Sequence, residues 1–181
     1  MQSKTKIIFL DVDGVLNNIG STEMFHGYYG VDQHLLENLK AVVDATGAKI
    51  VLSSSWKRFK NPDCSEHCFY KYLEQRLASV GLEILDITPE SSSRRGFGIL
   101  KWIHDNEPEL TDFIIIDDGI YDFKVYNLTP HWLQTSYKYN GGLSTKAVEC
   151  AIKMLNSGNY DSVVHESVTN YHFGIAEGEM Q

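Results

Sequence analysis

Asp11 and Asp13 stand one residue apart directly after the apolar run 7–10, and Gly14 follows them. The run predicts a strand buried on both faces, and such a strand has no structural use for two carboxylates at its tip. One carboxylate could act as a nucleophile or metal ligand, and the other could transfer a proton. Gly14 would allow a sharp turn and a close approach to a ligand. The competing interpretation is an Asx-type turn that ends the strand.

A second acidic pair, Asp117 and Asp118, follows the apolar run 113–116 and is again followed by a glycine. Ligands of open α/β sheets bind beyond the carboxyl ends of the strands, so both pairs are expected at one edge. Four carboxylates gathered there would repel one another without a cation. Hard oxygen ligands suit Mg²⁺, which tends to lie beside phosphate. The repetition therefore favours a metal and phosphate site over two unrelated turns.

Hydroxyl side chains follow a third apolar run. Ser53 and Ser54 come directly after residues 49–52, and hydroxyls at the tip of a core strand can donate hydrogen bonds to an anion. Serines in a row are also common in turns. The densest basic stretch, residues 57–60, comes next. It is either a solvated loop or a place where a phosphate-bearing substrate binds.

Arg94 and Arg95 precede a short helical pattern that ends before Pro108. The helix macrodipole prefers anions at this end, so an arginine is poorly placed there. This misfit favours a specific role for Arg95, such as pairing with a phosphate or a buried carboxylate.

Hydrophobic periodicity predicts the elements that position these residues. Buried strands are expected at residues 7–10, 49–52, 82–87, 113–116 and 132–136. Helical spacing occurs within residues 35–43, 69–80, 99–103 and 147–155. Asp32 is the expected N-cap of the first helix, Gly47 its stop, and Ser144 or Thr145 caps the last. Residues 17–30 are expected to form a long loop over the site.

The chain of 181 residues is predicted to be a single α/β domain over residues 1–181, with the motifs in residues 5–156. The tail, residues 157–181, has no clear period and no assigned role. A net charge of −8 argues against an extended nucleic-acid footprint and against an anionic membrane, although a local basic patch is compatible with it. The oligomeric state is not predicted.

The three cysteines are expected to be reduced thiols of a cytoplasmic protein, because no export signal or membrane-length apolar run is evident. Cys64 and Cys68 flank His67 and invite a zinc interpretation. A closed zinc site needs four ligands at recognisable spacings, and no partner pair follows downstream. Free thiols are therefore favoured.

Taken together, these motifs resemble the haloacid dehalogenase (HAD)-like phosphohydrolase superfamily. Residues 11–16 look like its first motif, Ser53 its second, Arg95 its third, and Asp117 with Asp118 its fourth. The run Leu-Ser-Ser-Ser-Trp, the Arg-Gly before an Ile and Trp helix, and Tyr-Asn-Gly-Gly-Leu-Ser resemble the branch associated with Swiss Army Knife RNA repair proteins. The resemblance implies a Rossmann-like parallel sheet of about five strands with helices on both faces. The short intervals between motifs leave no room for a large cap domain.

By this resemblance, Asp11 would attack phosphorus to form an aspartyl-phosphate, and Asp13 would protonate the leaving oxygen and then activate water. Ser53 would bind the phosphoryl group and Arg95 would neutralise it, with Ser54 and Arg94 as alternatives one residue away. Mg²⁺ would be held by the Asp11 carboxylate, the Asp13 backbone carbonyl and Asp117, with Asp118 acting directly or through water.

The expected function is a Mg²⁺-dependent phosphomonoesterase acting on a nucleotide or polynucleotide end phosphate. A small phosphorylated metabolite is the second substrate class. A receiver-like signalling domain and a non-catalytic phosphate-binding module are competing classes. The receiver arrangement fits less well, because here the middle strand ends in serines and a late strand carries the second acidic pair.

Overall fold

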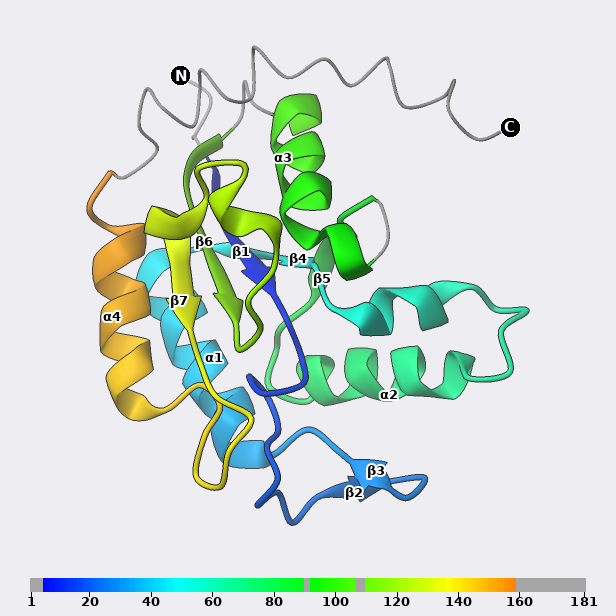
Figure 1. Cartoon of the computed structure of the whole chain (residues 1–181). Helices are drawn as coiled ribbons and strands as arrows, with labels where there is room; N and C mark the ends of the chain where they lie inside the picture. The colour runs from blue at the N-terminus through cyan, green and yellow to red at the C-terminus, as the bar shows by residue number, and fades with distance from the viewer. Residues whose placement is uncertain (1–4, 90–91, 107–109, 159–181) are drawn as a thin grey trace, which may run out of the picture.

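The computed structural model describes residues 5–89, 92–106 and 110–158, which form an α/β fold around a parallel sheet (Figure 1). The five strands of this sheet lie in the order β5-β4-β1-β6-β7, and every neighbouring pair is parallel. Their bounds are Thr5–Leu10 (β1), Lys49–Leu52 (β4), Ile84–Ile87 (β5), Leu110–Asp117 (β6) and Trp132–Gln134 (β7). The predicted fold class is confirmed.

The central strand β1 is apolar throughout its second half because both of its faces are covered. Ile8 and Leu10 pack into the core on one side of the sheet, and Ile7 and Phe9 pack into the core on the other. Strand β6 alternates in the same way. Two buried strands with this pattern lie side by side at the centre of the sheet, and both carboxyl ends point to the same edge.

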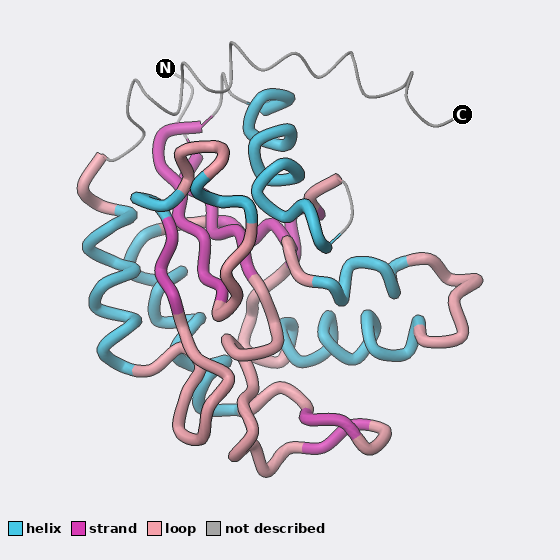
Figure 2. Tube along the Cα trace, viewed as in Figure 1, coloured by secondary structure: helices cyan, strands magenta, loops and turns pink. Residues whose placement is uncertain are grey.

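Helices cover both faces of the sheet (Figure 2). Helix α1 (Gln33–Thr46), helix α2 (His67–Ala78) and helix α4 (Thr145–Leu155) contribute to the core on one face. Helix α3 (Arg95–Asn106) packs on the other face through Phe97, Leu100 and Ile103. Ser144 caps α4 by accepting a hydrogen bond from the Ala147 amide, as one of the two predicted caps.

The structure differs from the sequence prediction at strand ends and at one cap. The third and fifth strands are shorter than predicted, because residues 82–83 and 135–136 lie outside the sheet pairing. Asp32 occupies the N-cap position of α1, but its carboxylate makes no capping hydrogen bond. It accepts instead from the Ser21 hydroxyl at 2.6 Å, so it fixes the preceding loop.

Residues 17–30 are more ordered than the predicted loop, because they contain an antiparallel hairpin, β2 (Met24–Phe25) and β3 (Tyr28–Tyr29). Its turn residues His26 and Gly27 both have positive φ, which matches the twist of a tight hairpin. Figure 1 shows the hairpin beyond the carboxyl ends of the central strands, near α2. Among the described residues between β1 and α1, the hairpin is the regular secondary structure, apart from an isolated bridge between Asp13 and Asn17.

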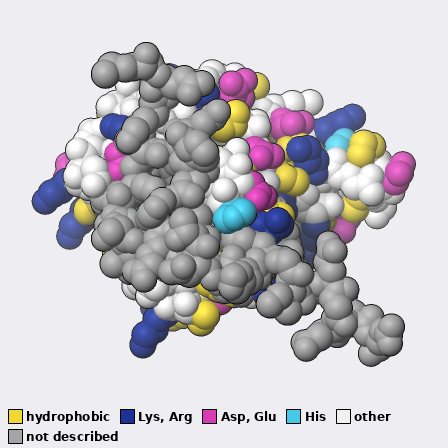
Figure 3. All heavy atoms as spheres, turned by 90° about the horizontal axis from the view of Figure 1, so that it is seen from above, with side chains coloured by type: hydrophobic (Ala, Val, Ile, Leu, Met, Phe, Trp, Pro, Cys, Tyr) yellow, Lys and Arg dark blue, Asp and Glu magenta, His cyan; other side chains and the backbone are white. Residues whose placement is uncertain are grey.

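No helix in the described ranges is long and apolar enough to cross a membrane. On the face shown in Figure 3, Lys and Arg side chains lie in separate places among acidic and neutral side chains. The described part of that face carries no continuous basic area.

Candidate active site

Three carboxylates converge where β1 and β6 end. The Asp11 amide donates to the Ile116 carbonyl at 3.0 Å, so the acidic segments that follow the two strands remain side by side. Asp11, Asp117 and Asp118 each offer an oxygen, and these atoms lie within 4.8 Å of one another. Asp11 and Asp117 are buried, and Asp118 is partly exposed. The register of two parallel strands thus produces an acidic cluster that could hold a metal ion.

Arg95 is the cation of this cluster. Its side chain is only 2% exposed, and its Nη1 donates to Asp11 Oδ2 at 2.6 Å and to Asp117 Oδ2. The Tyr121 ring lies 4.1 Å from the guanidinium carbon, so a cation–π contact supports the side chain from another direction. Three carboxylates and one guanidinium leave two formal negative charges when all are ionised.

Burial and crowding raise the pKa values of Asp117 and Asp118. Burial, together with the negative charge of Asp11, raises the pKa of Asp117 to about 7, although Arg95 opposes the shift. Burial also raises the pKa of Asp118, again with a contribution from Asp11. Burial lowers the pKa of Arg95, but the charges of Asp11 and Asp117 outweigh this effect and hold that pKa above its ordinary value. The cluster would therefore favour an additional positive charge.

Gly14 allows the cluster to close. Its φ is +74°, and a Cβ built on it would lie 2.4 Å from Asp118 Cγ. No side chain larger than hydrogen fits between the loop after β1 and the acidic segment after β6. The turn predicted from this glycine is therefore also a point of contact between the two acidic motifs.

Asp13 lies apart from the three clustered carboxylates and faces a cavity. Its Oδ1 accepts from Asn17 Nδ2 at 2.9 Å, and its Oδ2 accepts from the Trp56 indole Nε1 at 2.9 Å. Both oxygens are thus held by donors from the protein. A carboxylate oriented in this way and open on one side is suited to move a proton to or from a bound group.

The two candidate serines lie in different environments. Ser53 is fully buried, and its hydroxyl has no hydrogen-bond partner among the described residues. The Ser54 hydroxyl accepts from the Trp56 amide and caps the 3-10 helix η1 (Ser55–Lys60). Arg95 Nε is likewise buried without a partner in the described part of the chain. Unsatisfied buried donors are rare, so these two atoms are available for an anion.

The structure does not bring the other basic candidates to the carboxylates. Arg94 is exposed, with its guanidinium over the Phe97 ring. Lys57 turns away and donates to the side-chain and backbone oxygens of Thr88 and to the Pro89 carbonyl. Of the predicted basic stretch, Arg58 is the member that lines the cavity beside Asp13.

Several contacts at the site were not predicted from the sequence. Asn17 and Trp56 hold Asp13. Tyr121 supports Arg95. Asp122 accepts hydrogen bonds from the Gly96 and Phe97 amides at the start of α3. Asp122 supplies the anion that the helix macrodipole prefers there, so the start of α3 tolerates Arg95. The sequence position of Trp56 could have indicated its place at the site, because it directly follows the serine run at the end of a strand. No sequence pattern indicated that Tyr121 and Asp122 would lie at the site.

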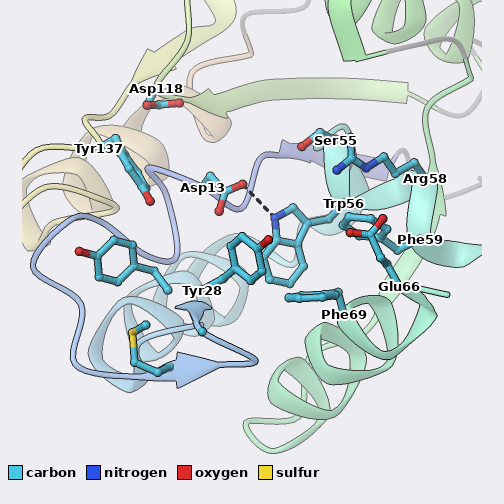
Figure 4. Close-up of a pocket in the computed structure, with 13 residues that line it drawn as sticks. Asp13, Tyr28, Ser55, Trp56, Arg58, Phe59, Glu66, Phe69, Asp118 and Tyr137 are labelled. Atoms are coloured by element: carbon cyan, nitrogen blue, oxygen red, sulfur yellow. Dashed lines mark hydrogen bonds between the residues drawn. The ribbon is translucent and has the colours of Figure 1, made fainter. Parts of the chain in front are cut away.

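A cavity of about 760 Å³ adjoins Asp13 and Asp118 (Figure 4). Its walls come from the β2–β3 hairpin, η1, the start of α2 and the loop after β7. Figure 4 shows Asp118 and Tyr137 on one side of Asp13, with Trp56, Arg58 and Glu66 on the other. Burial, together with the charge of Asp13, raises the pKa of Tyr137, so its hydroxyl stays protonated and can donate.

The donor set fits Mg²⁺. Clustered carboxylate oxygens are the ligands this ion prefers, and burial together with repulsion from Asp11 raises the pKa of Asp117, an effect that a divalent cation would offset. In the described residues, no other group of histidines, cysteines or acids is arranged to hold a metal. Cys64 and Cys68 are free thiols, and His67 contacts the Phe59 carbonyl. The zinc alternative therefore has no geometric support.

A parallel sheet with aspartates gathered at the tips of two adjacent central strands, and a buried arginine between them, has the arrangement of a HAD-like domain. The family model of the HAD domain in Swiss Army Knife RNA repair proteins matches residues 7–148. The chain belongs to this family, which confirms the resemblance inferred from the motifs. A search of curated proteins found no match.

Proposed function

We propose that this protein is a Mg²⁺-dependent phosphomonoesterase that works through an aspartyl-phosphate on the terminal phosphate of a nucleotide or polynucleotide. The observation that carries the proposal is the convergence of Asp11, Asp117 and Asp118 around Arg95, beside a cavity that contains Asp13. Phosphoryl transfer depends mainly on positioning and on neutralisation of charge, and this arrangement supplies both.

Each side chain has a defined task in this proposal. A carboxylate oxygen of Asp11 forms a bond to phosphorus while the bond from phosphorus to the leaving oxygen breaks, and Asp13 gives its proton to that oxygen. Asp13 then takes a proton from a water molecule, which attacks the phosphorus of the aspartyl-phosphate. Phosphate leaves and the Asp11 carboxylate is restored.

The remaining residues bind and orient the phosphoryl group. The unpartnered Ser53 hydroxyl and the Arg95 guanidinium would bind its oxygens. Mg²⁺, held by Asp11, Asp117, the Asp13 backbone carbonyl and Asp118 directly or through water, would neutralise charge that develops on the transferring group.

The substrate class rests on the family and on the site. The description of the matched family places its members in RNA repair. Among the described residues no large cap domain covers the site, which leaves access for the end of a nucleic-acid strand. A net charge of −8 argues against a long nucleic-acid footprint, so the proposal concerns an end phosphate. A small phosphorylated metabolite is the alternative that substrate ranking would reveal.

The test is hydrolysis of an aryl phosphate with and without Mg²⁺, followed by 3′- and 5′-phosphorylated oligonucleotides and mononucleotides. We expect metal-dependent turnover that Asp11→Asn reduces by at least about a thousandfold, on the scale of removing a catalytic nucleophile. Asp44→Asn, which changes an exposed carboxylate of α1 paired with Lys40, should retain full activity. Absence of turnover in folded protein that binds Mg²⁺ would favour a non-catalytic phosphate-binding module.

A further inference from the structure

The cavity beside Asp13 is much larger than a phosphoryl group requires. Its volume of about 760 Å³ lies in the range of sites that enclose whole small molecules. It shares Asp13 and Asp118 with the acidic site, so a group that occupies it would lie next to the reacting phosphate. The cavity is therefore positioned to accept the leaving group.

Six of the thirteen residues that line the cavity are aromatic. Tyr28 meets Phe69 edge to face at 5.6 Å, and Phe69 meets Trp56 in the same way at 5.7 Å. Tyr29 and Tyr137 form a second pair, with centroids 6.3 Å apart. Tyr28 is 66% exposed at the hairpin, so its ring is accessible to a ligand. Such surfaces match a flat aromatic group.

The hairpin that carries Tyr28 is fixed to α2. Phe25 stacks on Tyr72 at 4.2 Å with the rings nearly parallel, and the Tyr72 hydroxyl accepts from the Val31 amide at 2.9 Å. These contacts hold the hairpin against the wall formed by η1 and α2. The aromatic surface is thus preorganised on two elements that pack together.

The cavity also contains a cation that is not neutralised by the protein. Arg58 is exposed, its guanidinium lies 4.6 Å above the Phe59 ring, and it makes no ion pair with a described residue. It lies on the opposite side of Trp56 from Asp118 (Figure 4). A ligand that combines a flat ring with negative charge beyond the reacting phosphate would use both the aromatic surface and Arg58.

We propose, on the basis of the phosphatase function above, that this cavity binds the base of the phosphorylated nucleoside, with the exposed ring of Tyr28 as the stacking surface and Arg58 placed for the next phosphate of the nucleic-acid strand. Stacking of a base on an aromatic side chain contributes roughly ten- to hundredfold in affinity. Trp56, which lines the same cavity, donates to Asp13, so the proton-transferring carboxylate is held next to the proposed base subsite.

The first experiment compares substrates that differ only in the base. The pairs are a nucleoside 5′-monophosphate with ribose 5-phosphate, and a 5′-phosphorylated oligonucleotide with the same strand carrying an abasic terminal nucleotide. We expect kcat/KM to be about tenfold or more higher for the base-bearing member of each pair. Equal values within both pairs would overturn the subsite while leaving the phosphatase intact. No turnover of any substrate would overturn the phosphatase itself.

Variants of Tyr28 then test the stacking surface. Tyr28→Ala should lower the ratio of kcat/KM between base-bearing and base-free substrates about tenfold, and Tyr28→Phe should restore it, because stacking needs the ring and not the hydroxyl. Tyr139→Ala, which removes a tyrosine that is also exposed but does not line the cavity, should leave the ratio unchanged. An equal loss from Tyr28→Ala on both kinds of substrate would contradict a role in base binding.

Substitution of Arg58 tests whether the site prefers an oligonucleotide to a free mononucleotide. Arg58→Gln should raise the KM for the oligonucleotide several-fold at low salt. It should have a smaller effect on the KM for the mononucleotide, because only the oligonucleotide carries a second phosphate. Lys71→Gln, a loss of an exposed cation on α2 away from the cavity, is the matched control. Equal effects of Arg58→Gln on both substrates would overturn the strand contact. Faster turnover of phosphotyrosine peptides than of any nucleotide would overturn the nucleoside assignment.

Discussion

Gly14 shows how the site depends on the identity of single residues. It has a left-handed backbone conformation and lies against the side chain of Asp118, so both its φ and its lack of a side chain are used. Asp13 depends on its neighbours in a similar way, because Asn17 and Trp56 each orient one carboxylate oxygen. At this scale, function requires close contact between segments about a hundred residues apart.

Replacement of Gly14 separates backbone strain from steric conflict. Gly14→Ala adds a methyl group that would meet Asp118, in addition to about 1–2 kcal/mol for an alanine at positive φ. Gly47→Ala is the matched control, because its φ is +68° and its added Cβ meets nothing within 4 Å. In urea unfolding, we expect backbone strain to lower the free energy of unfolding of both variants by a similar amount. The steric conflict with Asp118 should lower that of Gly14→Ala further. Only Gly14→Ala should lose metal-dependent turnover, by at least about tenfold. Equal activity of the two variants would contradict this role for Gly14.

At the scale of elements, the hairpin and α2 form the wall of the cavity. Their contact includes the stacked pair Phe25 and Tyr72, and it includes a hydrogen bond from the buried backbone of Val31 to the Tyr72 hydroxyl. Arg76 reinforces it by donating to the Val31 carbonyl at 2.9 Å. The hairpin has few residues of its own, and two-stranded hairpins are marginal alone, so its position depends on α2.

Tyr72→Phe tests this contact. The ring stack is retained, but the Val31 amide loses its acceptor in a buried position, which should reduce the free energy of unfolding by about 1 kcal/mol. Hydrogen exchange at the Val31 amide should become faster than in the parent protein. Tyr139→Phe, which removes an exposed hydroxyl, should change neither quantity. Unchanged exchange in Tyr72→Phe would mean that the hairpin is held by other contacts.

For the molecule as a whole, the acidic site opposes folding when no cation is bound. Burial and Asp11 raise the pKa of Asp117 to about 7 from its ordinary 3.8, so the folded protein binds this proton more tightly than the unfolded chain. The resulting stability is fully present below about pH 4 and is lost as the pH rises through about 7. A bound divalent cation would offset the loss.

Urea unfolding in EDTA at pH 5 and pH 8 measures this effect. The parent should lose more stability between the two pH values than Asp117→Asn, which has no proton to release at this position. At pH 8, Mg²⁺ at a hundred times its dissociation constant should stabilise the parent by about 2.7 kcal/mol, and Asp117→Asn by much less. NaCl of equal ionic strength is the control for screening. Identical pH responses of the two proteins would show that Asp117 does not carry the effect.

Much of the fold could be predicted because its signals are local. Continuous apolar runs marked β1, β4 and β6, since strands covered on both faces need apolar residues at every position. Strand β5 was predicted to begin two residues too early and β7 to end two residues too late, because pairing with a neighbouring strand decides where each begins or ends. The hairpin was missed because its two short strands have no periodicity to detect.

The sequence by itself determined the acidic pairs, the glycine that follows each, the serine run and the arginine at the start of α3, because type and spacing are properties of the chain. Tertiary structure decided which of them meet. The register of β1 and β6 brought Asp11 to Asp117, and helix packing brought Arg95 rather than Arg94 to them. The contacts of Trp56 with Asp13 and of Tyr121 with Arg95, and the aromatic cavity, follow from packing between segments far apart in the sequence, and no pattern within one segment encodes such a contact.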